Sequence, residues 1–322
     1  MMRFGLALAA ALFVAPVFAQ GLTGNIAIHD PTIAVLDDGF ASFATGVEGS
    51  SDGGQIRTKT SPDGIDWQEA GALPGKMPQW VIDIFGYPPK NIWAPSVTEH
   101  DGTHYMYYSV SSFGKNTSVI GLMTNDDLKA ADPTSGWVDQ GLVLQSVVSD
   151  NFNAIDPFRI DSGERAWLTY GSYWQGIRLV EIDPESGMVL EGAQASFIAS
   201  RKGDAVEAPA ILEHDDKFYL FVSFDACCRG INSTYRIMVG RADTIEGPYL
   251  DKDGKPMLEG GGSELVSTQD RFIGPGGQEV FQRDGAPWLV FHFYNRLQGG
   301  TPNLYLTPIE WEDGWPTIAP LQ

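Results

Sequence analysis

Residues 206–224 read VEAPAILEHDDKFYLFVSF. A short apolar run is followed by the acidic pair Asp215 and Asp216 and then by a second run rich in aromatic residues. Two apolar or aromatic runs separated by a tight polar turn are typical of a β-hairpin. The hairpin accounts for the whole segment except Glu207, a carboxylate placed at the entrance to the first strand.

The same pattern occurs at four other places in the chain, each time with a proline near the start. These segments are HDPTIAVLDDGFASFAT from His29, WAPSVTEHDGTHYMYYSV from Trp93, IDPFRIDSGERAWLTYGS from Ile155 and GPGGQEVFQRDGAPWLVFHFY from Gly274. A further alternating strand and a polar turn follow most copies, and long helical periodicity is absent. Five repeated antiparallel units predict an all-β fold, a five-bladed β-propeller.

The first strand of each repeat is the natural candidate for the inner strand that lines the channel of a propeller. The residues around the five prolines would then meet at one mouth of the channel. Three of the five places carry a carboxylate, namely Asp30, Asp156 and Glu207, while the others carry Ala94 and glycines. Carboxylates that face one another in a partly dehydrated pocket are costly and are usually retained for function. Glycoside hydrolysis is the cofactor-free reaction that needs two carboxyl groups in unequal environments.

The first 20 residues, MMRFGLALAAALFVAPVFAQ, have the pattern of a secretory signal peptide, with cleavage expected after Ala19. An N-terminal anchor is the alternative. We therefore expect residues 20–322 to form a single catalytic propeller that is secreted or periplasmic and does not associate with membranes. A formal net charge of −20 disfavours nucleic acid and anionic lipid as partners and suits a neutral substrate.

The only two cysteines are adjacent, Cys227 and Cys228. A chain of this length without spaced cysteines is not a disulfide scaffold, so its stability must come from a large core. The adjacent thiols either form a vicinal disulfide or stay buried and free, and the absence of a nearby redox motif favours buried free thiols. No Cys and His spacing resembles a zinc site.

An ordered set of motifs makes the chain similar to a known family. The segments HDP, NIWAPSV, NAIDP, GSYWQGI, EAPAI and SFDACCRGINSTYRIMVGR together resemble glycoside hydrolase family 43, most closely its endo-α-1,5-L-arabinanase branch. The resemblance covers essentially residues 20–322 and implies an inverting hydrolase that cleaves arabinan, a neutral plant cell-wall polysaccharide. We expect the protein to be a monomer. An exo-acting α-L-arabinofuranosidase or a β-xylosidase of the same family is the alternative. A non-catalytic carbohydrate-binding propeller is a further one, against which the three carboxylates argue.

The resemblance also implies roles for the three carboxylates. Asp30 corresponds to the general base that activates water, Glu207 to the general acid, and Asp156 to the carboxylate that orients the acid and tunes its pKa. Sugar rings need flat apolar faces and a few hydrogen-bonding groups. The candidates for substrate contact are Trp93, Trp174, Asn153, Ser172 and Arg229.

The fifth repeat departs from the pattern of the family. Relatives often have GPGH there, with the histidine facing a hydrated calcium ion in the channel, whereas this chain has GPGG with Gly277 in that place. Gln278 or water could substitute for the missing ligand, so a hydrated calcium ion in the channel stays an open alternative for this chain. The chemistry itself requires no cofactor. His292 is expected either near the channel or packed in a strand, and Ser96 and Asn295 stand where relatives often have an acidic residue.

Overall fold

The computed structural model describes residues 21–49 and 53–322, so the expected signal peptide, residues 1–19, lies outside the described part. The hairpin predicted for residues 206–224 is formed by β14 (Val206–His214) and β15 (Lys217–Phe224), paired antiparallel. Asp215 and Asp216 make its turn with φ of 48° and 56°. Positive φ at both central residues defines the hairpin turn whose twist matches the strands, and Asp tolerates it.

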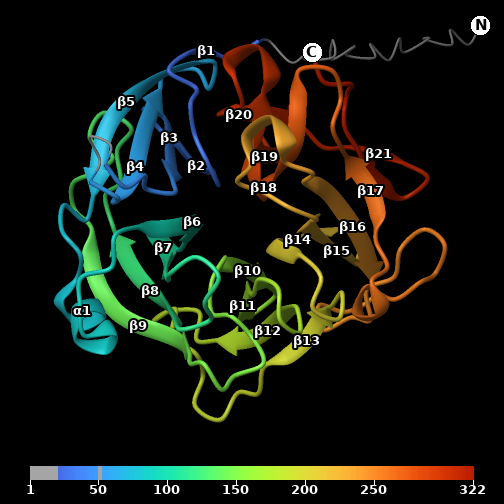
Figure 1. Cartoon of the computed structure of the whole chain (residues 1–322), viewed down its shortest axis with the longest axis horizontal. Helices are drawn as coiled ribbons and strands as arrows, with labels where there is room; N and C mark the ends of the chain where they lie inside the picture. The colour runs from blue at the N-terminus through green and yellow to red at the C-terminus, as the bar shows by residue number, and fades with distance from the viewer. Residues whose placement is uncertain (1–20, 50–52) are drawn as a thin grey trace, which may run out of the picture.

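The four other predicted hairpins are also present, and each is the inner half of a blade (Figure 1). They are β2 (Thr32–Leu36) with β3 (Gly39–Ala44), β6 (Ile92–His100) with β7 (Thr103–Val110), β10 (Phe158–Ser162) with β11 (Arg165–Tyr170), and β18 (Phe272–Arg283) with β19 (Ala286–Asn295). The inner strands contact one another in the order β2, β6, β10, β14, β18 and back to β2. This closed ring confirms the five-bladed β-propeller and its predicted inner strands.

The outer strands complete the blades in sequence order. They are β4 (Ile56–Ser61) and β5 (Asp66–Leu73), β8 (Ser118–Asn125) and β9 (Val138–Ser146), β12 (Ile177–Ile182) and β13 (Ser196–Ala199), β16 (Arg236–Ala242) and β17 (Ser263–Val266), and β20 (Thr301–Pro308). Smaller elements lie at the rim of the propeller. They are β1 (Thr23–Gly24), α1 (Gln79–Phe85), η1 (Gly230–Asn232), η2 (Met257–Glu259), η3 (Arg296–Gln298), β21 (Glu310–Glu312) and β22 (Trp315–Thr317).

The start of the chain closes the ring. Blade five has only three strands of its own, and a segment near the N-terminus lies beside its outer strand, β20. Ala27 bridges Asn303 antiparallel, and the amide of Ile28 donates to the carbonyl of Pro302 at 2.9 Å. Backbone hydrogen bonds thus join the first and last blades and cover an edge that would otherwise be unpaired.

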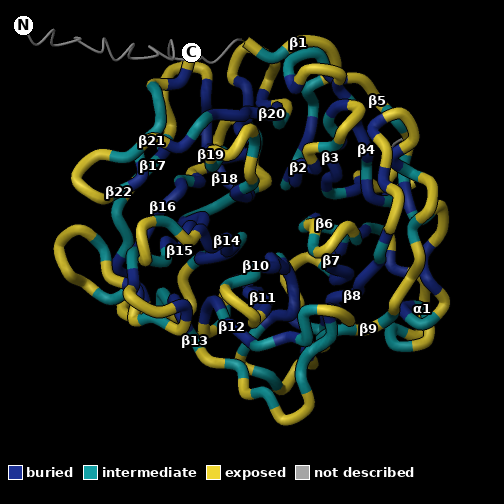
Figure 2. The backbone as a smooth tube through the Cα atoms, turned by 180° about the vertical axis from the view of Figure 1, so that it is seen from behind, coloured by how far each residue is buried: buried dark blue, intermediate teal, exposed yellow. Residues whose placement is uncertain are grey.

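The core lies in the layers between neighbouring blades (Figure 2). One apolar cluster includes Ile160, Phe221 and Phe291, which come from three successive blades. Each blade therefore covers the face of the next, which provides the large core that the sequence required. Among the described residues, no helix is long and apolar enough to cross a membrane.

Candidate active site

The entrance to each inner strand contains a kink in which one residue adopts a left-handed backbone conformation. The five kink residues have φ between 41° and 57°, and they are Asp30, Ala94, Asp156, Ala208 and Gly277. In blades two, four and five the kink coincides with a bulge in the pairing between the first two strands. Bulges re-aim side chains, and they are over-represented next to active sites.

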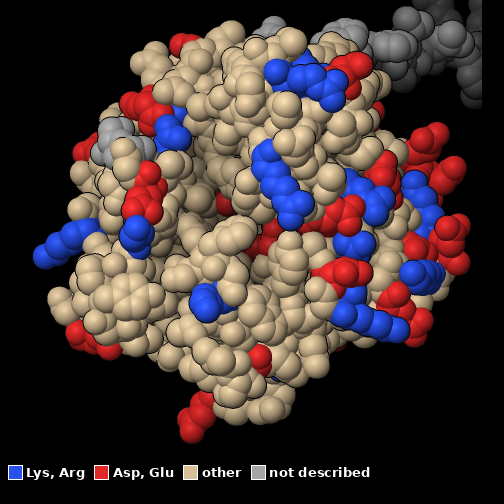
Figure 3. All heavy atoms as spheres, viewed as in Figure 1, with Lys and Arg blue, Asp and Glu red and all other residues tan. Residues whose placement is uncertain are grey.

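The kink defines which residues are equivalent between blades. Asp30 and Asp156 occupy the same kink position, and Gly277 is its counterpart in blade five. Glu207 lies one residue earlier, before the kink residue Ala208. A cavity of about 40 Å³ on the propeller axis is lined by all five kink residues. In space-filling view the face around the axis is hollowed, with acidic side chains in the hollow (Figure 3).

Asp30 is held in its ionised form by a set of donors. Its Oδ2 accepts a hydrogen bond from Thr45 Oγ1 at 2.6 Å and lies 2.8 Å from His29 Nδ1. Its amide donates to His292 Nδ1 at 3.1 Å. Burial raises the pKa of Asp30, but the charge and hydrogen bond of His29, together with His292 and Thr45, outweigh it and hold the pKa well below its ordinary value.

Glu207 is in the opposite state. Glu207 is only 7% exposed, and its Oε2 accepts a hydrogen bond from Ser172 Oγ at 2.6 Å. Burial raises the pKa of Glu207 to about 7; Asp30 adds to the rise, and Ser172 and His29 oppose it. At neutral pH a large fraction of this carboxyl group is therefore protonated and able to donate.

Asp156 links the two sides of the site. Its Oδ2 accepts from the amide of Ala208 at 3.1 Å, and its own amide donates to Ser109 Oγ at 3.0 Å. Burial raises its pKa well above the ordinary value, and the charges of Glu207 and Asp30 raise it further. Asp156 thus contacts the peptide directly after Glu207 and interacts electrostatically with both other carboxylates.

The arrangement separates the pKa values of two facing carboxyl groups. Asp30 is ionised and can accept a proton, whereas Glu207 retains a proton and can donate it. A general base and a general acid need environments that push their pKa values apart in this way. The three carboxylates predicted from the repeats are therefore brought together with the unequal environments that the reaction class needs.

The predicted substrate-contacting residues are more dispersed. Ser172 lies in the site, because its hydroxyl donates to Glu207. Trp93 is half-buried and precedes the kink of its blade, the position that Glu207 has in blade four. Asn153 is buried and its Oδ1 accepts from Ser118 Oγ at 2.6 Å, so this oxygen is already partnered.

Trp174 and Arg229 lie in loops above the strands. Trp174, with φ of 42°, lines a separate surface pocket of about 470 Å³ together with Phe197 and Leu258. None of the residues that line this pocket lines the axial cavity. Arg229 is exposed, and its amide donates to Ser233 Oγ at 3.0 Å.

Sequence reasoning missed the partners that set the state of Asp30. His29 stands in the quoted HDP motif, so its position beside Asp30 was visible, but nothing in the sequence showed that it faces Tyr294 at 2.8 Å. Thr45 gave no signal, because it comes from the end of the second strand. His292, left open between channel and strand, is fully buried and stacks on His29 with ring centroids 3.8 Å apart.

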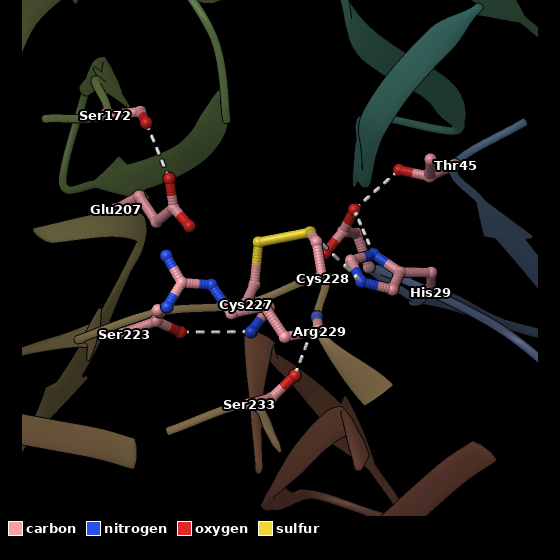
Figure 4. The surroundings of a disulfide bond; sticks show 12 residues. His29, Thr45, Ser172, Glu207, Ser223, Cys227, Cys228, Arg229 and Ser233 are labelled. Carbon is pink, nitrogen blue, oxygen red and sulfur yellow. Dashed lines mark hydrogen bonds and ion pairs between the residues drawn. A yellow bond between two sulfur atoms is a disulfide. The ribbon is translucent and has the colours of Figure 1, made fainter. Parts of the chain in front are cut away.

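The expectation of buried free thiols was wrong. Cys227 and Cys228 form a disulfide, Cys227 is half-buried and Cys228 is exposed. The two residues lie in the loop between β15 and β16 rather than in a strand, where core packing would have enclosed them. The loop runs between the proposed acid and base regions, as Figure 4 shows for Glu207 and His29.

The blade-five residues expected to face a channel cation, Gly277 and Gln278, are poorly suited to bind it directly. Gly277 offers no side chain, and a Cβ there would lie 2.4 Å from Asp30 Oδ1. Gln278, the expected substitute, is already engaged, since its Oε1 accepts from Ser223 Oγ at 2.7 Å. Glu279 accepts a hydrogen bond from Ser96, and burial raises its pKa to about 8, so it is largely neutral.

Two close groups of potential metal ligands occur in the described part of the chain, and the first of them lies in the candidate site. They are His29 with Asp30 and His292, and His100 with Asp101 and Glu185. The first group is already joined by the hydrogen bonds that hold Asp30. We derive no chemical step through a cation.

The fold and the site together define a propeller glycoside hydrolase. The chain belongs to the glycosyl hydrolases family 43, whose model matches residues 23–316. It is 40% identical over 295 residues to the extracellular endo-alpha-(1->5)-L-arabinanase 1 of Bacillus subtilis, covering 91% of this chain and 88% of the relative. It is 36% identical over 308 residues to the extracellular exo-alpha-(1->5)-L-arabinofuranosidase ArbA of Cellvibrio japonicus, covering 91% and 87%. The solved Cellvibrio cellulosa alpha-L-arabinanase complexed with arabinohexaose superposes with a TM-score of 0.83 at 35% identity, covering 91% of this chain and 96% of that chain.

Proposed function

We propose that this protein is an exported inverting hydrolase that cleaves α-1,5-linked L-arabinan within the chain. The observation that carries the reaction type is the opposite displacement of two pKa values, low for Asp30 and raised to about 7 for Glu207. Arabinan as substrate is supported by the arabinan-related names of the relatives and by the arabinohexaose in a solved structure. Export is supported by the signal pattern and by relatives named extracellular.

The proposed reaction is a single displacement. Asp30 accepts a proton from a water molecule as the water oxygen attacks the anomeric carbon, and Glu207 gives its proton to the departing glycosidic oxygen. One carbon–oxygen bond breaks and one forms, with inversion at the anomeric carbon. Asp156 assists by accepting a hydrogen bond from the Ala208 amide, which orients the peptide directly after the acid. Ser172 orients the Glu207 carboxyl through its hydroxyl.

The roles are tested by substitution. Asp30→Ala and Glu207→Ala are each expected to fold normally and to lose nearly all hydrolysis of linear arabinan. Proton NMR of the first product formed by the unaltered enzyme should show the inverted anomer. Retention of wild-type turnover by either variant would remove the corresponding residue from the proposal, and a retained anomer would remove the single displacement.

Cleavage within the chain is favoured by the endo-acting name of the Bacillus relative at 40% identity. Release from a chain end is the second candidate, because the Cellvibrio relative at 36% identity is named as exo-acting. The product profile on linear arabinan discriminates the two. A mixture of oligosaccharides early in the reaction supports endo action, whereas a single short product supports exo action.

A further inference from the structure

The loop between β15 and β16 carries the disulfide and is anchored at its base. Asp225 begins the loop, and its carboxylate oxygens accept from Arg201 Nη1 and Arg236 Nε, each at 2.8 Å. Further along, the amide of Thr234 donates to the carbonyl of Ala226 at 2.8 Å. The two ends of the loop are therefore fixed to the blade and to each other.

The disulfide fixes the tip of this loop. A bond between adjacent cysteines closes a small covalent ring around their shared peptide and restricts the backbone conformations that this peptide can adopt. Cys228 is held at φ of 66°, a conformation that residues other than glycine rarely adopt. The direction of the Cys228 amide is thereby set by a covalent constraint as well as by the loop anchors.

That amide begins a chain of contacts that ends at Asp30. The Cys228 N–H donates to Tyr294 Oη at 2.7 Å, and Tyr294 Oη lies 2.8 Å from His29 Nε2. The opposite nitrogen of the same ring, His29 Nδ1, lies 2.8 Å from Asp30 Oδ2. Cys228 Sγ also approaches His29 Nε2 at 3.8 Å.

Both ring nitrogens of His29 are thus used, one toward the carboxylate and one toward the disulfide loop. Tyr294 is 3% exposed, so its hydroxyl lies in a region where a lost partner is not readily replaced by water. Stacking on His292 fixes the plane of the His29 ring, but it does not prevent the ring from turning within that plane. The contact with Tyr294 supplies the constraint on rotation.

We propose that the Cys227–Cys228 disulfide and Tyr294 form a positioning unit that orients His29 and, through it, the carboxylate of Asp30. The unit acts on the base without touching the reacting atoms. This inference rests on the proposed assignment of Asp30 as the general base. It goes beyond that assignment by giving the adjacent cysteines a role in turnover.

The first test uses reduction of the purified protein. A water-soluble phosphine reduces the bond with one water molecule, giving two thiols and the phosphine oxide. With two free thiols verified by a colorimetric thiol reagent, kcat on linear arabinan should fall about tenfold, with KM changed less than twofold, and reoxidation should restore it. The Cys227→Ser/Cys228→Ser double variant should match the reduced enzyme and be indifferent to the phosphine.

The second test leaves the disulfide intact. Tyr294→Phe keeps the ring and removes the hydroxyl that joins Cys228 to His29, and it should also lower kcat about tenfold. Tyr219→Phe is the matched control. Tyr219 is also buried, but its hydroxyl donates to the carbonyl of Gly314 at 2.8 Å, outside the candidate site. Circular dichroism and thermal melting confirm that each variant is folded.

Coupling distinguishes positioning from a general structural effect. In an Asp30→Ala background, with azide supplied as an external nucleophile and an aryl arabinoside as substrate, Tyr294→Phe should cause no further loss, because the unit acts through Asp30. A further tenfold loss in that background would overturn the proposal. So would an unchanged kcat after verified reduction, a rise in KM alone, or free thiols in the native protein. If Asp30→Ala itself kept wild-type turnover, the proposed function would fail instead.

Discussion

Removing the hydroxyl of Ser172 should raise the pH at which the enzyme loses activity on the alkaline side. Ser172 Oγ donates to Glu207 Oε2 at 2.6 Å, and this hydrogen bond stabilises the ionised carboxylate. The hydrogen bond therefore lowers the pKa of Glu207, but burial outweighs it, and the resulting pKa is about 7. Without the bond, the carboxyl group should keep its proton to a higher pH.

The size of the shift follows from the worth of the hydrogen bond. A hydrogen bond to a charged, buried group contributes about 1.5–3 kcal/mol, and one pKa unit corresponds to about 1.4 kcal/mol. Because the protonated acid also uses part of this bond, we expect Ser172→Ala to move the alkaline limb of kcat/KM upward by about one unit. The maximum rate should fall at the same time, since the acid loses the group that orients it.

The assay is a pH profile of kcat/KM on linear arabinan from about pH 4 to 10. Ser162→Ala is the matched control, because Ser162 Oγ donates to Glu213 Oε2 at 2.8 Å on the exposed surface. It should leave both limbs in place. A limb that stays fixed or moves to lower pH in folded Ser172→Ala would refute either the hydrogen bond or the role of Glu207 as the acid.

Three further outcomes are expected. His29→Phe keeps the stacking on His292 but removes the group that lowers the pKa of Asp30. The acidic limb of the pH profile of kcat/KM should therefore move to higher pH. His100→Phe, which breaks a remote pair with Asp161, is the control. Gly277→Ala should lower both kcat and the free energy of unfolding, the latter by about 1–3 kcal/mol in a urea titration, because its Cβ would meet Asp30 and the His292 ring. Gly285→Ala, at φ of 74° in open space, controls for backbone strain alone. Chelator treatment should leave turnover within twofold, because every proposed proton transfer uses only Asp30, Glu207 and water; a loss that added calcium restores would contradict this.

The fold was predictable because each blade repeats the same local code. Alternating apolar residues, a two-residue acidic turn and a proline at the strand entrance recur five times, and each signal depends only on neighbours in sequence. The closure of the ring was not predictable in this way. The pairing of Ala27 with Asn303 joins residues from opposite ends of the chain and has no local signature.

The residues of the candidate site also differ in how far local sequence could predict them. Asp30, Asp156 and Glu207 were identifiable because they stand at matching places in the repeats. Ser172 was named as a candidate for substrate contact, but Thr45 and Tyr294 were missed, since Thr45 follows the end of a second strand and Tyr294 comes from another blade. The state of Cys227 and Cys228 was mispredicted because the sequence does not show whether adjacent cysteines lie in a core strand or in an exposed loop.

The repeat places the carboxylates, but departures from the repeat decide what each one does. Asp30 and Asp156 share one backbone position, yet the pKa of Asp30 is held well below its ordinary value and that of Asp156 is raised well above it. The largest difference is that a histidine precedes Asp30 and an isoleucine precedes Asp156, and His292 and Thr45 lower the pKa of Asp30 further. Glu207 stands one residue earlier than both, at the place that His29 occupies in the first blade. The proposed acid and the partner of the proposed base are therefore equivalent residues in different blades. Exchanging Glu207 for an apolar residue should remove the proton donor, whereas exchanging His29 should only shift the pH at which Asp30 can accept a proton, and neither change should disturb the propeller.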